Sequence, residues 1–211
     1  MRRLLLVAGA IVTLAGAGAA HASIVSDPTG DFLGSFVGNH DPDLDVTSFA
    51  VSYNAATTTF TLNATLAGAI NPALPGLYVI GVNTGTGAIA PFAGIGEPNV
   101  IFNQVAVVQK TGAATIGANA LTATILDNTF SLLVPLNLLP STGLTPENYG
   151  WNLWPRNGLG NNNQISDFAP ENSTLAAIPE PGTWAMLLVG FGVLGAALRR
   201  RRTATTAVQP A

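Results

Sequence analysis

Cysteine is absent from this chain of 211 residues, and basic residues are scarce. Charged residues make up 9% of it, against about 25% in a typical soluble protein. Six of the eight Lys and Arg residues lie near the two ends, so residues 23–178 keep only Lys110 and Arg156 against ten acidic residues, a net charge of −8. Phosphate recognition needs clustered basic side chains, which excludes nucleic acid as a partner of this body. The absence of thiols is compatible with export to an oxidising compartment.

Residues suited to catalysis are also few. Beyond residue 22, His40 is the only histidine and Lys110 the only lysine, so a Ser-His-Asp triad or a histidine-based transition-metal site would depend on His40. There is no Walker A motif, and no spacing of carboxylates singles out a pair for glycoside hydrolysis. The sequence predicts a protein that is not an enzyme, and a secreted glycan hydrolase is the less favoured alternative.

The N-terminus has the three parts of a secretory signal. Arg2 and Arg3 precede an apolar run over residues 4–14, and Ala20-His21-Ala22 is a small-x-small cleavage site. We therefore expect a signal peptide at residues 1–22, with Ala20 and Ala22 directing cleavage and Ser23 as the mature N-terminus. An uncleaved N-terminal membrane anchor is the alternative.

The C-terminus combines a short motif, an apolar run and a basic cluster. After Pro179-Glu180-Pro181, Trp184 and Ala185 begin an apolar run that ends at Leu198. The run is followed by Arg199, Arg200, Arg201 and Arg202. Residues 183–198 would form a helix about 24 Å long, at the short limit for crossing a membrane. Trp184 suits the membrane interface, and the arginines favour a cytoplasmic far end, which would leave residues 203–211 as a cytoplasmic tail.

This order of parts resembles a PEP-CTERM sorting signal, in the variant with Trp-Ala two residues after Pro-Glu-Pro. The resemblance implies export through the secretion machinery and anchoring in the inner membrane, followed by processing by an exosortase near the motif. It also implies a Gram-negative host that makes exopolysaccharide, and a final location at the cell surface or in the extracellular matrix. Residues 203–211 depart from the pattern, because relatives usually end at the basic cluster. An ordinary C-terminal anchor is the alternative.

The body is predicted to be all-β. It holds 17 Thr and 17 Asn, which favour strands and turns respectively. Alternating apolar residues indicate a hairpin of two strands, 48–53 and 60–66. Further strands are expected at residues 77–82, 100–110, 121–126, 130–134, 149–154 and 164–168, with a turn at Asp127-Asn128 before the strand 130–134. About eight strands indicate an antiparallel β-sandwich or jelly roll over residues 23–172, with loops at 84–96 and 157–163 and a linker at 173–178.

Acidic residues gather in the first part of the body, with no Lys or Arg among them. They are Asp27, Asp31, Asp41, Asp43 and Asp45. In an extended chain the last three would project to one side, and hard oxygen ligands suit Ca²⁺. We expect calcium as a cofactor here, with Asn39 as a possible neutral ligand. A solvated acidic loop and a catalytic carboxylate site are the alternatives.

Two short acidic motifs support the calcium interpretation. Asp27-Pro28-Thr29-Gly30-Asp31, followed by Asp43-Leu44-Asp45-Val46 before an alternating strand, is similar to the opening of calcium-containing β-sandwich modules of the glucodextranase and DOMON-like group. That similarity implies a structural calcium near the first strand. It does not imply a sugar ligand.

Large aromatic residues near the end of the body allow a second interpretation. Tyr149, Trp151 and Trp154, with Arg156 close by, could form a platform for exopolysaccharide, but core packing explains the same residues. Arg156 could also pair with a carboxylate. The leading prediction is a non-enzymatic protein of the cell envelope or extracellular matrix, and a carbohydrate-binding module is the alternative.

Overall fold

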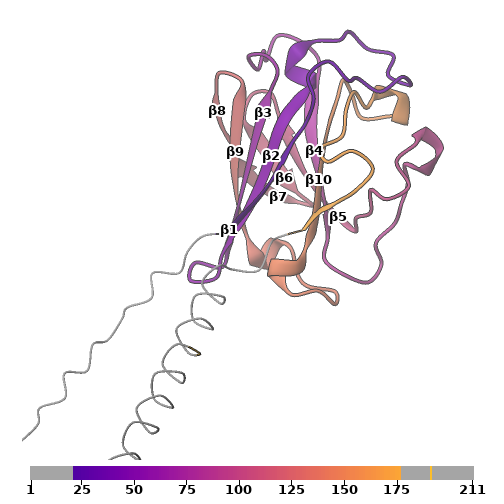
Figure 1. The fold of residues 1–211 in the computed structure, drawn as a ribbon. Helices are drawn as coiled ribbons and strands as arrows, with labels where there is room; N and C mark the ends of the chain where they lie inside the picture. Colours follow the sequence, from indigo (N-terminus) through magenta and orange to yellow (C-terminus); the bar gives the residue numbers. More distant parts are fainter. Residues whose placement is uncertain (1–20, 177–190, 192–211) are drawn as a thin grey trace, which may run out of the picture.

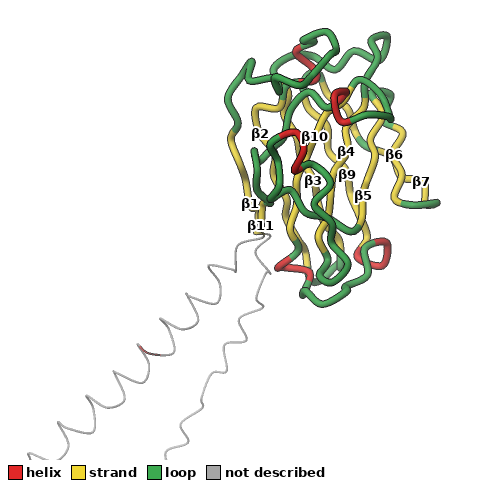
Figure 2. Tube along the Cα trace, turned by 90° about the vertical axis from the view of Figure 1, so that its right-hand side faces the viewer, coloured by secondary structure: helices red, strands yellow, loops and turns green. Residues whose placement is uncertain are grey.

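The computed structural model describes residues 21–176 and residue 191, and these residues form two antiparallel β-sheets packed face to face (Figure 1). Figure 2, turned by 90°, shows the strands of both layers side by side, with loops gathered at the two ends. The prediction of an all-β body with two sheets is confirmed. Residues 1–20 of the predicted signal peptide and, apart from residue 191, the predicted membrane helix lie outside the described residues. No helix among the described residues has the length and apolar character needed to cross a membrane.

The first sheet has five strands in the order β1-β2-β3-β9-β8. They are β1 (His21–Ser26), β2 (Val46–Asn54), β3 (Thr59–Leu66), β9 (Thr129–Pro135) and β8 (Thr124–Leu126). The predicted hairpin is β2 and β3, whose register pairs Val51 with Leu62. The predicted turn at Asp127 and Asn128 joins β8 to β9.

The second sheet has six strands in the order β11-β10-β4-β5-β6-β7. They are β11 (Leu175–Ala176), β10 (Gly150–Arg156), β4 (Leu77–Asn83), β5 (Gln104–Gln109), β6 (Ala113–Ile116) and β7 (Asn119–Thr122). Within residues 21–176, five single-turn 3₁₀ helices lie in the loops: η1 (Pro42–Leu44), η2 (Ala93–Ile95), η3 (Leu136–Leu138), η4 (Pro146–Asn148) and η5 (Asn162–Gln164).

Some predicted elements differ from the structure. The segment 164–168 is not a strand, because η5 ends there and only isolated bridges, such as Arg156 with Ile165, join it to β10. The predicted strand 121–126 divides at the buried Ala123, whose N–H donates to the carbonyl of Gly112, and its halves enter different sheets. The predicted linker contains β11, which pairs with β10.

The main core fills the space between the sheets. Phe49 and Phe60 from the first sheet, and Trp151 and Leu153 from the second, are fully buried there. A second apolar cluster covers the outer face of the second sheet, where Trp154 packs against Phe92 and Phe168 from two loops. Strand β4 is therefore buried on both faces, as its continuous apolar run predicts. The predicted loop 84–96 contributes to this cluster through Phe92 and Ile95.

The first and last strands meet at one edge of the sandwich. Ser23 Oγ donates a hydrogen bond of 2.5 Å to the carbonyl of Ala176. Figure 1 shows the chain entering β1 and leaving β11 at one end of the domain, while the segment between β1 and β2 loops over the opposite end. The acidic residues between β1 and β2 therefore lie at the opposite end of the domain from the points where the chain enters β1 and leaves β11.

Candidate metal centre

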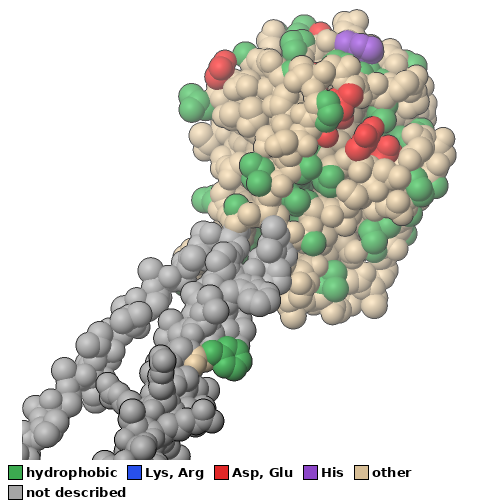
Figure 3. All heavy atoms as spheres, in the orientation of Figure 1, with side chains coloured by type: hydrophobic (Ala, Val, Ile, Leu, Met, Phe, Trp, Pro, Cys, Tyr) green, Lys and Arg blue, Asp and Glu red, His purple; other side chains and the backbone are tan. Residues whose placement is uncertain are grey.

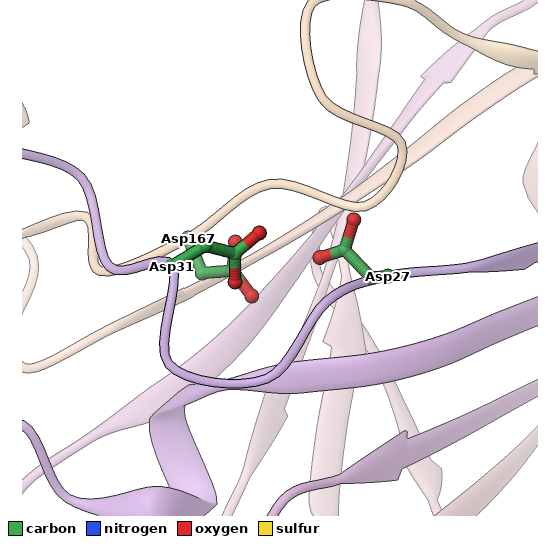
Figure 4. Close-up of side chains that lie close together, drawn as sticks. All are labelled: Asp27, Asp31 and Asp167. Carbon is green, nitrogen blue, oxygen red and sulfur yellow. The ribbon is translucent and has the colours of Figure 1, made fainter.

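Three carboxylates from distant parts of the chain converge beside β1. Asp27 follows the last residue of β1, Asp31 lies in the next loop, and Asp167 lies between η5 and β11. Each offers one oxygen atom, and these oxygens all lie within 4.8 Å of one another. In Figure 4, Asp27 faces Asp31 and Asp167 across a small gap.

Backbone hydrogen bonds fix Asp167 in this position. Its Oδ2 accepts from the N–H of Val46, and its Oδ1 accepts from the N–H of Phe168, both at 2.7 Å. The segment is joined to the acidic loop by the N–H of Leu33, which donates to the carbonyl of Ser166 at 2.8 Å. Asp167 is 3% exposed, so its charge is largely shielded from water.

Asp45 lies close to the three and supports the loop that carries two of them. Its Oδ2 accepts from the N–H of Gly30 at 2.7 Å. Gly30 has a φ of +85°, a conformation that glycine adopts without the steric cost of a side chain. Burial is the main cause of the raised pKa of Asp27 and of Asp167, and repulsion from the carboxylate of Asp45 adds to both.

Several carboxylate oxygens here are buried without a partner. Oδ2 of Asp27, Oδ1 of Asp31 and Oδ1 of Asp45 have no hydrogen-bond partner among the described residues. Leaving a buried acceptor unsatisfied costs about 1–3 kcal/mol, and more for a charged group. Three such atoms in one region can serve as ligands for a cation.

Repulsion and burial together raise the proton affinity of these acids. Burial, followed by the negative charges of Asp167 and Asp31, raises the pKa of Asp27 to about 8. Burial also raises the pKa of Asp167 to about 7, against the opposing hydrogen bond from Val46. The pKa of Asp45 is raised as well, chiefly by burial. At neutral pH the group therefore needs either bound protons or a cation.

The body has no side-chain cation available for this group. Lys110 forms a buried ion pair with Asp43, with 2.7 Å between Nζ and Oδ2. Arg156 donates to the carbonyls of Gly158 and Asn161, rather than to the carboxylate that the sequence suggested as a partner. These are the only basic residues between positions 21 and 176 apart from histidine. Figure 3 shows acidic side chains gathered on the visible face, where no described Lys or Arg is seen.

The arrangement fits a hard divalent cation. Calcium binds oxygen ligands at about 2.3–2.6 Å, so two ligands of one ion lie at most about 5 Å apart. The spacing of the three carboxylates, within 4.8 Å, satisfies this condition. Ca²⁺ takes 6–8 oxygen ligands, so backbone carbonyls or water would complete its shell.

The predicted ligands separate in the structure. Asp27 and Asp31 belong to the group, and Asp45 lies beside it. Asp43 points elsewhere, because Pro42 begins the turn of η1 and breaks the extended chain on which a shared side for residues 41, 43 and 45 depended. Its Oδ2 accepts from the N–H of Asn71 and pairs with Lys110. Asp41 precedes η1 and does not belong to the three-carboxylate group, and Asn39 is exposed.

Asp167 was missed by sequence reasoning. It lies 136 positions after Asp31 in the chain, and no spacing motif connects them. The only feature of the sequence that marks Asp167 is that it is an acidic residue in a segment without a nearby Lys or Arg.

The predicted aromatic platform is wrong for this structure. Tyr149, Trp151 and Trp154 are 0%, 0% and 1% exposed, so none can offer a ring face to a ligand. As expected for a strand, Trp151 and Trp154 point to opposite faces, and each enters a different apolar cluster. Burial of both faces of β10 explains why neither ring is free.

Comparison with known protein families matches residues 177–202 to the PEP-CTERM protein-sorting motif. The chain thus carries the signal of an exported protein that is sorted by an exosortase, as its C-terminal sequence predicts. The match covers Pro179-Glu180-Pro181 and the four arginines, which lie outside the described residues. No curated protein and no solved structure matches the chain.

Proposed function

We propose that this chain is a non-enzymatic protein of the cell surface or extracellular matrix, whose exported β-sandwich is held together by a structural calcium ion. The observation that carries the proposal is the set of buried carboxylate oxygens of Asp27, Asp31 and Asp45 that have no partner among the described residues. Asp167 adds a fixed fourth carboxylate. The ion supplies positive charge that the body lacks.

The proposed ion has a mechanical role. It joins the loop after β1 to the segment that follows β10, and Asp45 links both to the start of β2. These segments come from opposite ends of the body in sequence, so a ligand between them stabilises the folded state relative to the unfolded chain.

Calcium suits the location that the sorting motif implies. Extracellular modules commonly bind Ca²⁺ with a Kd of about 10⁻⁴–10⁻³ M. Magnesium is the weaker candidate, because it requires nearly octahedral geometry and dehydrates reluctantly.

A hydrolase based on carboxylates is the second candidate. The raised pKa of Asp27 and of Asp167 favours it, because a general acid must hold its proton near neutral pH. His40 is the only histidine beyond position 22. Its ring stacks on Phe32, with 4.3 Å between the ring centroids, and does not join the carboxylates. Turnover of a glycan panel that is lost on Asp27→Asn, with calcium binding unaffected, would favour the hydrolase.

The proposal is tested by titrating the full chain, purified in mild detergent and stripped with chelator, with Ca²⁺ in a calorimeter. We expect one ion per chain, and a loss of at least tenfold in affinity on Asp31→Asn, which removes a charge without changing the shape of the side chain. Asp127→Asn is the matched control, because Asp127 lies in the exposed β8–β9 turn away from the group. No heat of binding at millimolar Ca²⁺, or an equal loss in both variants, refutes the proposal.

A further inference from the structure

The outer face of the first sheet is a surface of uncharged side chains, most of them small, with Ile24, Leu126 and Leu133 exposed among them. Residues on the inner face of β2, β3 and β9, such as Leu62 and Phe130, are buried in the core. Their neighbours face outward and align across the strands in register. One row is formed by Ala50, Asn63, Ser131 and Thr124, and the next by Ser48, Thr65, Thr129 and Leu126. None of these residues carries a charge.

A groove of about 300 Å³ lies at the β8 side of this face. The outward side chains that line it are Asn63, Thr65, Thr124, Leu126, Thr129 and Ser131. They contribute four hydroxyl groups, one amide and one aliphatic side chain. Binding sites for small ligands and for short stretches of a polymer are typically about 300–1,000 Å³, so the groove is of a size to hold one or two sugar rings.

Most of these polar groups are available for a ligand. Thr129 Oγ1 donates to the carbonyl of Leu126 at 2.7 Å. The side chains of Asn63, Thr65, Thr124 and Ser131 make no hydrogen bond with any other described residue. Some polar side chains elsewhere on the domain bond to one another, as Thr84 and Asn103 do. Four unpaired polar side chains in one groove therefore offer donors and acceptors to an outside molecule.

We propose that this groove binds a neutral polysaccharide chain. Sugar hydroxyls match the hydroxyl and amide groups of the lining, and no charged side chain lines the groove to select an ionic ligand. The net charge of −8 on the body repels acidic glycans. A second copy of the chain is the weaker occupant, because a stable protein interface buries about 800 Å² and about 20–30 residues on each partner, whereas eight residues line this groove.

The groove is separate from the candidate metal centre. It lies between β3, β9 and β8, whereas the three carboxylates lie beyond the end of β1, at the other edge of the sheet order. Glycan binding and calcium binding can therefore be tested independently, and failure of one leaves the other in place.

The experiment measures the retardation of the full chain, in mild detergent, in native gels that contain dextran, galactomannan or laminarin, with alginate as the anionic comparison. The test variant combines Thr65→Val with Ser131→Ala, which removes two hydroxyls from the groove. The matched control combines Thr61→Val with Ser52→Ala, which removes two hydroxyls from the same outer face outside the groove. Thermal unfolding of both variants reports whether the fold is kept.

We expect retardation by at least one neutral glycan. We expect the groove variant to bind it about tenfold more weakly, as the loss of two hydrogen bonds implies, while the control binds as the parent does. The proposal is overturned if no neutral glycan retards the chain, if alginate alone does so, or if both variants lose affinity equally. It is also overturned if sedimentation shows a dimer that only the groove variant abolishes, since the groove then contacts a second copy.

Discussion

The Nζ atom of Lys110, the only lysine in the chain, lies 2.7 Å from Oδ2 of Asp43, and each side chain is 2% exposed. The pair joins the end of β5 to the turn of η1, and Lys110 also donates to the carbonyl of Pro75 at 3.1 Å. This pairing removes Asp43 from the candidate metal centre. It also leaves Asp27, Asp31, Asp45 and Asp167 without a basic neighbour.

Lys110→Met is expected to destabilise the fold strongly. The substitution leaves the buried carboxylate of Asp43 without its counter-charge, and breaking a buried ion pair in this way costs about 3–5 kcal/mol. The double variant Lys110→Met with Asp43→Asn removes both charges and should recover part of that loss. Chemical unfolding of the parent and both variants measures the effect, and a loss below about 1 kcal/mol for Lys110→Met would contradict the role of the pair.

The stability of the calcium-free protein should fall as the pH rises from about 4 to 8. The pKa of Asp27 is raised to about 8 and that of Asp167 to about 7, both from 3.8, so the folded state holds more protons than the unfolded state over this range. Calcium binds the deprotonated carboxylates, so its stabilising effect should grow over the same range. Thermal unfolding between pH 5 and 8, with chelator and with calcium, measures both trends. A constant difference between the two conditions would be inconsistent with these carboxylates as ligands.

Signal cleavage is expected after Ala22, which gives Ser23 as the mature N-terminus. In the structure His21 and Ala22 belong to β1, where they pair with Tyr53 and Ser52. Cleavage at this site must therefore precede the pairing of β1 with β2, because a protease binds its substrate as an extended, accessible chain. N-terminal sequencing of the exported protein checks the site, and recovery of Met1 on the envelope would show that the signal remains.

Replacing Pro179, Glu180 and Pro181 with alanine should leave export intact and trap a longer, membrane-associated form. The apolar run and the arginines at residues 199–202 are unchanged in this variant, so the anchor expected from them persists. Fractionation and intact mass of the parent and the variant provide the comparison. Release of a shortened body from the variant would show that sorting does not depend on the motif.

The sequence predicts the parts of the fold that depend on local pattern. The alternation of apolar residues predicts the β2–β3 hairpin, and Asp127-Asn128 predicts the turn between β8 and β9. Core packing of Trp154 is one of the two interpretations that the sequence leaves open, and the sequence does not decide between them, because the burial of this ring depends on Phe92 and Phe168 from loops that fold over the second sheet.

The candidate site was only half predictable for the same reason. Asp27 and Asp31 are close in sequence and stay together, whereas Asp167 reaches them through tertiary folding. Asp43 leaves the group because of an ion pair with Lys110, a residue 67 positions away. Local spacing reports which carboxylates are near one another along the chain, but not which of them meet a lysine in the core.

The most direct test of the calcium-stabilised fold is thermal unfolding of the full chain in mild detergent, with millimolar Ca²⁺ and with chelator. Calcium at one hundred times its Kd adds about 2.7 kcal/mol, which for a domain of this size raises Tm by about 5–10 °C. We expect this rise for the parent and for Asp127→Asn, a much smaller rise for Asp31→Asn, and a weaker effect of Mg²⁺. Identical melting of the parent in calcium and in chelator would contradict the calcium-stabilised fold.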